Sequence, residues 1–290
     1  MVACCYPSEV IEMSALQLAE TQSDLPYIHG FSATEQARLV RQARFSEAVV
    51  YRDVDFSGVQ KLLEVGCGVG AQTEILLRRF PDVDITGLDF SQRQLAVARQ
   101  RLQGSPEHGR ATLLHMDAED LDFPPASFDG AFLCWILEHV HSPERVLAEV
   151  RRVLKPGARL YATEAMNATF FLAPYSANLQ KYWMAFNDHQ LSVGGDPFVG
   201  AKLGNILMRL GFRHVETQVK TWHLDSREPH RRQQVLDYWT ELLLSAADQL
   251  IEAGRVDAEL VEIMTKELRL LRSNPELVFF YSFMQASAVV

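Results

Sequence analysis

The chain has 290 residues, of which 28 are basic and 37 acidic, so its formal net charge is −9. Hydrophobic residues make up 48% and charged residues 22% of the sequence, which is typical of a globular protein. This composition excludes intrinsic disorder and low-complexity architectures. The acidic balance also argues against nonspecific binding to nucleic acid or to anionic membranes.

The cysteines and the N-terminal residues indicate an intracellular protein without a metal centre. Cys4, Cys5, Cys67 and Cys134 form no Cys-x-x-Cys motif and no metal-ligand spacing, so unpaired thiols are expected. The segment Met1–Met13 lacks the basic region and apolar run of a secretory signal peptide. No window of the sequence approaches the ~20 apolar residues of a membrane span. We therefore expect a cytoplasmic protein.

In chain order, the first predicted element is a helix from Ser32, which opens a Ser-Ala-Thr-Glu capping box, to about Val50. Short apolar runs then alternate with amphipathic segments. The predicted strands are 61–65, 83–88, 112–116, 128–135 and 159–164, and the predicted helices are 71–80, one capped by Ser91, and 144–154. This alternation predicts a doubly wound α/β fold, whose ligands bind beyond the carboxyl ends of the strands.

Residues 166–290 follow a different pattern. The stretch 166–198 is rich in aromatic residues and predicted to be irregular. Residues 231–272 predict two helices broken at Gly254, and they lie between the β-rich stretches 214–224 and 277–290. We expect these two stretches to complete the sheet, with the helices inserted between them.

A glycine-rich turn follows the first predicted strand. In Glu64-Val-Gly-Cys-Gly-Val-Gly70, the glycines allow a tight turn and the close approach of a ligand to the backbone. The next helix offers free N–H groups at its start. The motif also fits the loose dinucleotide-binding fingerprint, so by itself it does not distinguish a nicotinamide enzyme from other nucleotide-binding proteins.

Two acidic positions help to distinguish a nicotinamide enzyme from other nucleotide-binding proteins. Asp89 closes the second predicted strand about 20 residues after the glycine motif, a spacing that suits a carboxylate receiving ribose hydroxyls. Asp117, in the run Asp-Ala-Glu-Asp after the third strand, can accept a hydrogen bond from an adenine amino group. A nicotinamide-binding domain has no general need for an acidic residue at this second position.

Five segments in order resemble the class I S-adenosylmethionine-dependent methyltransferases, in particular the small-molecule branch related to ubiquinone and menaquinone methyltransferases. They are LLEVGCGVGAQTEILLRR, GLDFSQRQLAVAR, MDAEDLDFP, SFDGAFLCWILEHV and LAEVRRVLKPG. The resemblance implies a Rossmann-like, doubly wound sheet of seven strands with an antiparallel last strand. It also implies an N-terminal helical lid, helical insertions, and the cofactor S-adenosyl-L-methionine with its product S-adenosyl-L-homocysteine.

The same resemblance assigns the cofactor site residue by residue. Glu64, Gly66 and Gly68 would line the methionine part, and Asp89 would hold the ribose with Phe90 against the adenine. Completing the implied set are Asp117 and Ala118 at the adenine edge, Cys134 and Trp135 beside the sulfonium, and Tyr27 and Arg38 in the lid. Arg38 would pair with the cofactor carboxylate or remain a solvated helix charge. His29 is a weaker candidate that would orient the lid.

The candidate bases follow the fourth strand. His139 and Glu138 are placed to touch the reaction zone, although the pair also recurs as a helix-start sequence with a capping and packing role. The candidate acceptor pocket is aromatic and comprises Tyr175, Tyr182, Trp183, Phe186 and Trp239. Because aromatic stripes at helical spacing are also typical of an ordinary core, that alternative stays open.

These observations predict one integrated domain with a lid segment at 1–57, a cofactor-binding core at 58–165 and a substrate cover with the last strands at 166–290. The expected activity is methyl transfer to an oxygen, nitrogen or carbon of a small molecule, with no nucleic-acid or membrane partner and a monomer or homodimer as the assembly. A protein or RNA methyltransferase of the same fold, or a cofactor-binding protein without transfer activity, is the alternative. The sequence identifies neither the acceptor nor the atom methylated.

Overall fold

The computed structural model describes residues 27–105 and 107–290. The predicted lid segment is therefore described only from residue 27, and Cys4 and Cys5 lie outside the described residues. Within the described part, Cys67 and Cys134 are free thiols, as predicted. None of the helices in the same part is both long and apolar enough to cross a membrane.

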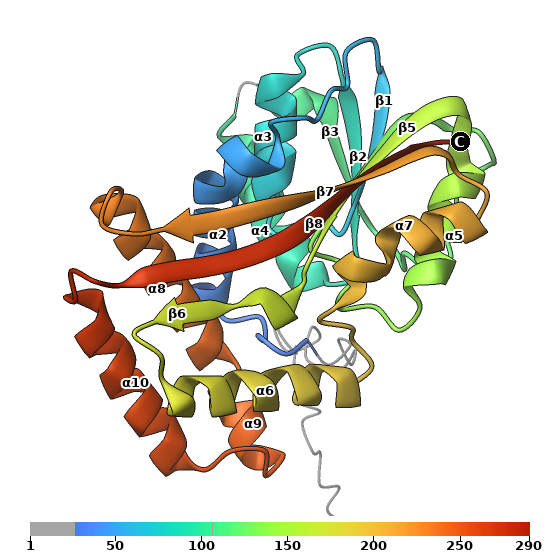
Figure 1. Ribbon diagram of the computed structural model, residues 1–290. Helices are drawn as coiled ribbons and strands as arrows, with labels where there is room; N and C mark the ends of the chain where they lie inside the picture. Colours follow the sequence, from blue (N-terminus) through green and yellow to red (C-terminus); the bar gives the residue numbers. More distant parts are fainter. Residues whose placement is uncertain (1–26, 106) are drawn as a thin grey trace, which may run out of the picture.

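The centre of the molecule is a single mixed sheet of eight strands in the described chain (Figure 1). These are β1 Lys61–Val65, β2 Asp84–Asp89, β3 Ala111–His115, β4 Phe128–Cys134, β5 Leu154–Glu164, β6 Phe171–Ala173, β7 Arg213–Leu224 and β8 Val278–Val289. The order runs β3-β2-β1-β4-β5-β8, and β7 pairs with β8. The first five strands are parallel, whereas β8 is antiparallel to β5, β6 and β7.

The strand order reverses at β1, which pairs with both β2 and β4. Val65 at the end of β1 is in register with Leu88 of β2 and Leu133 of β4. The segments that follow these three strands therefore meet at one edge of the sheet. In an open α/β sheet, this reversal is where a ligand-binding crevice forms.

Alternate residues of the central strands enter two separate cores. Leu62 of β1 and Phe132 of β4 pack on one face, and their neighbours Leu63 and Leu133 pack on the other. The first core also holds residues of α3 and α4, and the second holds residues of α5 and α7. Figure 1 accordingly shows helices on both sides of the sheet. The doubly wound α/β architecture predicted from the sequence is thus confirmed.

The helices are α2 Ala33–Val50, α3 Ala71–Arg79, α4 Gln92–Gln103, α5 Pro143–Val153, α6 Ala177–Ser192, α7 Leu203–Arg209, α8 Pro229–Ser245, α9 Ala247–Glu252 and α10 Ala258–Arg272. Short 3₁₀ turns occupy His108–Arg110, Asn167–Thr169 and Val199–Lys202. Helix α2 begins as predicted, because the Ser32 hydroxyl accepts the Glu35 N–H at 3.1 Å. Helices α6, α9 and α10 lie together at one end of the molecule (Figure 1).

The structure corrects the prediction for residues 166–198. This stretch is not irregular, because residues 177–192 form α6, which Ser176 caps. Its buried face combines Leu179, Tyr182, Trp183 and Phe186 with polar residues. The sheet also has eight strands rather than seven, since β6 pairs with the part of β8 that extends beyond β5.

The inserted helical segment has three helices rather than two. Gly254, at a φ of +64°, separates α9 from α10 as predicted. A further interruption at Ala246 divides the first predicted helix into α8 and α9. The proposed division of the chain into three segments stays a prediction.

Candidate active site

The turn after β1 is held close to the neighbouring strand. The N–H groups of Gly66 and Cys67 both donate to the Leu88 carbonyl oxygen, at 2.8 and 2.9 Å. Gly66 has a φ of +73°, and a Cβ built there would lie 2.3 Å from Cδ1 of Ile136. Gly68 has a φ of +52°, but a Cβ there would enter open space. Glycine is therefore required at position 66 by both the backbone conformation and the packing, and at position 68 by the backbone conformation.

The Asp89 carboxylate is fixed at the same turn. One of its oxygens, Oδ2, accepts the Gly68 N–H at 2.8 Å, and the other accepts the Ser91 N–H at 2.8 Å. The Ser91 side chain caps α4 by accepting the N–H of Gln94. Helix capping is thus done by Ser91, and the Asp89 carboxylate instead connects the ends of β1 and β2.

The glycine turn and Asp89 line an open cavity of about 1020 Å³, here called the glycine-loop cavity. It is lined by Tyr27, Phe31, Leu39, Gln42, Ala43, Gly66, Cys67, Gly68, Val69, Ala71, Gln72, Asp89, Phe90, Ser91, Gln94, Cys134, Trp135, Ile136, His139 and Val140. Phe90 is 38% exposed and its ring lies 5.9 Å from that of His115. The predicted cofactor residues Tyr27, Gly66, Gly68, Asp89, Phe90, Cys134 and Trp135 are brought together here.

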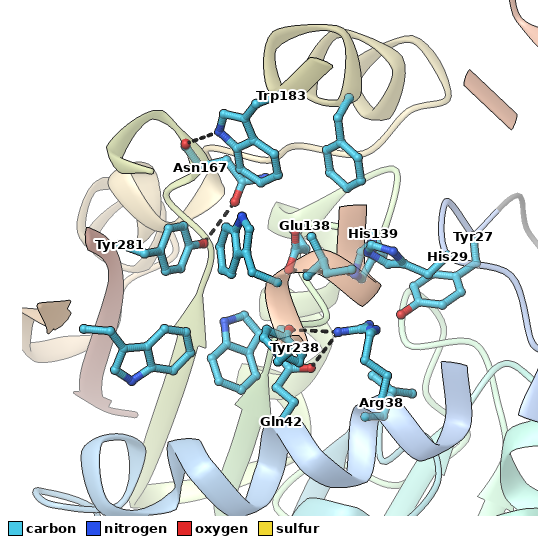
Figure 2. A pocket seen from close by; sticks show the side chains of 16 residues that line it. Tyr27, His29, Arg38, Gln42, Glu138, His139, Asn167, Trp183, Tyr238 and Tyr281 are labelled. Atoms are coloured by element: carbon cyan, nitrogen blue, oxygen red, sulfur yellow. Dashed lines mark hydrogen bonds and ion pairs between the residues drawn. The ribbon is translucent and has the colours of Figure 1, made fainter. Parts of the chain in front are cut away.

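A second cavity of about 530 Å³ is drawn in Figure 2, is here called the aromatic cavity, and shares lining residues with the first. It is lined by Tyr27, His29, Arg38, Leu39, Gln42, Trp135, Glu138, His139, Asn167, Trp183, Phe186, Trp222, Tyr238, Trp239, Leu242 and Tyr281. In Figure 2 the histidines and Tyr27 lie at one end, opposite Asn167, Trp183 and Tyr281. The residues shared by both cavities are Tyr27, Leu39, Gln42, Trp135 and His139. These five side chains form the boundary at which the cavities meet.

The turn after β4 shapes this boundary. Trp135 has a φ of +55°, which is uncommon for a bulky residue, and its N–H donates to the Thr163 carbonyl at 2.8 Å. The next two N–H groups, of Ile136 and Leu137, donate to Oε1 of Glu164 at 3.0 and 2.7 Å. Burial, reinforced by the nearby Glu138, raises the pKa of Glu164 to about 8. Glu164 therefore positions the backbone that carries Trp135.

His139 and Glu138 project from this turn. Nε2 of His139 lies 3.7 Å from Oε1 of Glu138, and burial lowers the pKa of His139. The other Glu138 oxygen accepts from the side-chain amide of Gln190 at 3.1 Å. The His139 ring meets the Tyr27 ring edge-on at 4.9 Å. His139 lines both cavities, whereas Glu138 lines the aromatic one.

Arg38 is a buried internal cation, so the alternative of a solvated helix charge is wrong. Its side chain is 3% exposed, and Nε and Nη2 donate to the two Glu35 oxygens at 2.6 and 2.5 Å. Nη1 donates to the Tyr238 hydroxyl at 2.8 Å. Tyr27 donates to Glu35 at 3.1 Å. Arg38 lines the aromatic cavity and is absent from the glycine-loop cavity.

Besides Arg38, three predicted cofactor residues do not line the glycine-loop cavity. Glu64 is 2% exposed beneath the glycine turn, where its Oε2 accepts from the Thr73 hydroxyl at 2.7 Å and burial raises its pKa to about 8. The Asp117 carboxylate accepts the N–H of Glu119 at 2.8 Å. Ala118 is buried in the core that contains α5.

The predicted acceptor residues separate into two groups. Trp183, Phe186 and Trp239 line the aromatic cavity. Tyr175 is 66% exposed, and Tyr182 is fully buried with its hydroxyl donating to the Leu243 carbonyl, so neither lines a cavity described here.

Several residues that line the aromatic cavity were not predicted from the sequence. Gln42 lies one helical turn after Arg38 on α2, a spacing that could have revealed it. Trp222 and Tyr281 are partners across β7 and β8, with ring centroids 5.9 Å apart. The backbone carbonyl of Asn167 accepts a hydrogen bond from the Trp183 indole N–H at 2.9 Å. Its side-chain oxygen accepts one from the Tyr281 hydroxyl at 3.0 Å. No local signal identifies these last three, because they meet only through the pairing of distant strands.

Comparison with known proteins agrees with this geometry. Residues 63–162 match the family model described as a methyltransferase domain. The chain is 36% identical over 130 residues to a demethylmenaquinone methyltransferase of Symbiobacterium thermophilum, covering 43% of this chain and 49% of that enzyme. It is 32% identical over 158 residues to an O-methyltransferase of Penicillium expansum, covering 54% of this chain and 53% of that enzyme. The chain thus spans about half the length of the curated relatives that it matches.

A solved structure extends the likeness to the whole fold. Phosphoethanolamine N-methyltransferase 2 of Haemonchus contortus, in complex with phosphomonomethylethanolamine and S-adenosylhomocysteine, matches 94% of this chain and 59% of that one. The TM-score is 0.56 at 17% sequence identity, so this likeness concerns the fold. Residues 63–162 are therefore a methyltransferase domain, in a chain that resembles the class I S-adenosylmethionine-dependent methyltransferases of the menaquinone type.

Proposed function

We propose that this protein transfers a methyl group from S-adenosylmethionine to an oxygen, nitrogen or carbon atom of a small molecule. The observation that carries the proposal is the common boundary of the two cavities, where Trp135 and His139 line both. A donor in one cavity and an acceptor in the other would meet at these side chains. Methyl transfer requires the donor and the acceptor to be aligned at close range, and two adjoining cavities allow this.

The glycine-loop cavity fits the cofactor in its chemistry. Gly68 leaves open space where another residue would place a Cβ, so the backbone is accessible to a ligand. Asp89 presents a carboxylate to the cavity and would receive the ribose hydroxyls, with Phe90 against the adenine. Cys134 and Trp135 would lie beside the sulfonium, and Tyr27 would cover it. When bound, S-adenosylmethionine supplies an electrophilic methyl group.

Glu64 would act on the cofactor from beneath the glycine turn. Its carboxyl group is buried and accepts from the Thr73 hydroxyl, and its pKa of about 8 leaves it mostly protonated at neutral pH. A cationic ligand above the turn would favour the ionised form. The roles of Asp117 and Ala118 at the adenine edge stay a prediction, and neither residue lines the glycine-loop cavity.

The aromatic cavity is the proposed acceptor site. Trp183, Phe186 and Trp239 offer flat apolar walls, and His139 and Glu138 line the same cavity. This combination suits a small, largely planar or amphipathic acceptor with one ionisable nucleophile. Alignment of the nucleophile with the methyl group can supply ~7–11 kcal/mol, and a general base adds about 3–5 kcal/mol.

His139 is the proposed residue beside the path of the methyl group. Burial keeps its imidazole neutral near pH 7, and Glu138 lies 3.7 Å from Nε2. The pair can orient an acceptor hydroxyl or amine at the boundary by hydrogen bonding. A protein or RNA acceptor is disfavoured, since the walls of this cavity are buried side chains of the chain itself.

Calorimetric titration with S-adenosylhomocysteine, NAD and NADP tests the cofactor. Asp89→Ala should strongly weaken the binding of S-adenosylhomocysteine, whereas Asp84→Ala, on the exposed opposite end of β2, should leave it unchanged. Binding of a nicotinamide nucleotide alone would overturn the proposal.

An acceptor screen then tests the transfer reaction. Purified protein with S-adenosylmethionine is mixed with pools of phenols, amines and quinols, beside peptide and RNA pools, and S-adenosylhomocysteine formation is followed by mass spectrometry. Turnover confined to a small-molecule pool supports the proposal. Tight cofactor binding with no turnover in any pool would indicate a binding protein instead.

A further inference from the structure

His29 and Ser245 are joined by a hydrogen bond at the edge of the aromatic cavity. Nδ1 of His29 lies 2.7 Å from the Ser245 hydroxyl oxygen. His29 precedes α2, and Ser245 is the last residue of α8, so the bond connects segments far apart in the sequence. His29 is 8% exposed and lines the aromatic cavity.

The surroundings of Ser245 determine which nitrogen of His29 carries the proton. The Ser245 hydroxyl donates its single hydrogen to the Leu242 carbonyl at 2.8 Å. It can therefore only accept from the imidazole, and Nδ1 must be the donor. In a neutral ring, Nε2 is then the atom with the free lone pair. Within the described residues, no hydrogen bond engages Nε2.

The position of His29 places it on the acceptor side of the boundary. His139 lines both cavities, but His29 lines only the aromatic one, and the two ring centroids are 6.1 Å apart. Figure 2 shows the two side chains at the same end of the cavity. In an in-line transfer the nucleophile lies between the methyl group and the rest of the acceptor. A base that takes its proton must therefore lie on the acceptor side.

The groups around His29 keep it neutral. The ring faces Tyr27 in its own segment, Arg38 of α2, His139 of the β4–α5 turn, Phe186 of α6 and Ser245 of α8. Burial, followed by the positive charge of Arg38, lowers the pKa of His29 well below its ordinary value of 6.5. The imidazole is consequently unprotonated at neutral pH, so Nε2 carries a lone pair there.

We propose that His29 is the general base of the methyl transfer, and that Ser245 is a positioning residue that sets its tautomer. The inference rests on the proposed function. The acceptor X–H bond breaks and its proton moves to Nε2 of His29 while the new X–methyl bond forms. The methyl–sulfur bond breaks with its electron pair going to sulfur, which leaves S-adenosylhomocysteine, and His29 afterwards releases the proton to solvent.

The kinetic test uses matched substitutions and the acceptor found in the screen. His29→Asn retains a donor for Ser245 but has no basic nitrogen, and it should lower the single-turnover rate about 10²–10⁴-fold. Ser245→Ala should lower the rate up to about tenfold, the value of one hydrogen bond. Thr240→Ala is the control, because its hydroxyl also bonds a carbonyl of α8, at 2.8 Å, but does not line the cavity. All three should bind S-adenosylhomocysteine like the wild type.

Nitrogen-15 NMR of the histidine rings supplies a measurement that does not depend on turnover. In protein saturated with S-adenosylhomocysteine, His29 should be neutral between pH 6 and 8 with the proton on Nδ1, and Ser245→Ala should produce a mixture of tautomers. A charged ring at pH 7, or a proton on Nε2, would overturn the inference.

The outcomes separate this inference from the proposed function. Wild-type turnover together with a His29→Asn rate within a few-fold of wild type overturns the role of His29 and leaves the methyl transfer intact. Absence of wild-type transfer to every acceptor, with S-adenosylhomocysteine bound, removes the proposed function and the inference together.

Discussion

Gly66 and Ile136 are packed so closely that a methyl group on the glycine would lie 2.3 Å from Cδ1 of the isoleucine. The contact joins the turn after β1 to the turn after β4, on the two strands at which the sheet order reverses. The glycine at this position therefore serves the packing between two turns, in addition to the conformation of its own turn.

Gly66→Ala should destabilise the protein by roughly 2–4 kcal/mol, because overpacking adds to the cost of a left-handed backbone. Gly68→Ala has the same backbone cost without the clash, and should lose only about 1–2 kcal/mol. Thermal unfolding of both variants measures the difference. Equal losses would contradict the packing explanation.

Arg38→Met should cost about 3–5 kcal/mol, because it leaves the buried Glu35 carboxylate without its cation. The double variant Arg38→Met/Glu35→Gln removes both charges and should recover most of the loss. Chemical denaturation of the single and double variants compares their free energies of unfolding.

The same double variant tests whether Arg38 holds the cofactor carboxylate, as the family resemblance implies. Since Arg38 lines only the aromatic cavity, the affinity for S-adenosylhomocysteine should be unchanged. A large loss of affinity in the stable double variant would restore the cofactor role.

Glu164→Gln should change how stability depends on pH. The folded protein holds the Glu164 proton up to a pKa of about 8, whereas the unfolded chain releases it near 4.5. The wild type therefore loses stability as the pH rises between these values, since the unfolded state binds fewer protons there. The loss is on the order of a few kcal/mol for one fully buried group.

The variant should resemble the wild type near pH 5 and be more stable than it at pH 9, as measured by thermal unfolding across this range. Glu259→Gln, on the exposed face of α10, should follow the wild type throughout. A Glu164→Gln curve parallel to the wild type would mean that the carboxyl group is ionised in the folded state.

Trp239→Phe should raise the KM for the acceptor and leave the affinity for S-adenosylhomocysteine unchanged, because Trp239 lines only the aromatic cavity. Tyr182→Phe is the control, since it removes a buried hydrogen bond to the Leu243 carbonyl outside the cavity. It should cost about 1 kcal/mol of stability without affecting KM. An equal rise in KM for both variants would argue against the aromatic cavity as the acceptor site.

The sequence predicted the parallel strands and the glycine-loop cavity well because these depend on neighbouring residues. The alternation of strands and helices, the glycines from Gly66 onwards and the position of Asp89 at a strand end are local features. The family resemblance adds Cys134 and Trp135 to the same group. Each of these residues lies in or just after a strand whose register with its neighbours brings the set together.

Helix α6 and much of the aromatic cavity could not be predicted in this way. The buried face of α6 mixes Trp183 and Phe186 with Asn187, His189 and Gln190, so the apolar period that marks a helix is interrupted. The pairing of Trp222 with Tyr281 depends on the register of β7 and β8, which are separated by three helices. The separation of Tyr182 from the cavity likewise depends on a contact between distant segments, its hydrogen bond to the Leu243 carbonyl of α8.

Both cavities share one helix as a wall. Leu39 and Gln42 of α2 line both, and Arg38 anchors this helix to Tyr238 of α8. A molecule in either cavity would thus contact the same helix. If both molecules favour the same placement of α2, thermodynamic linkage requires that each strengthen the binding of the other by an equal factor, and the affinity for one then depends on whether the other is bound.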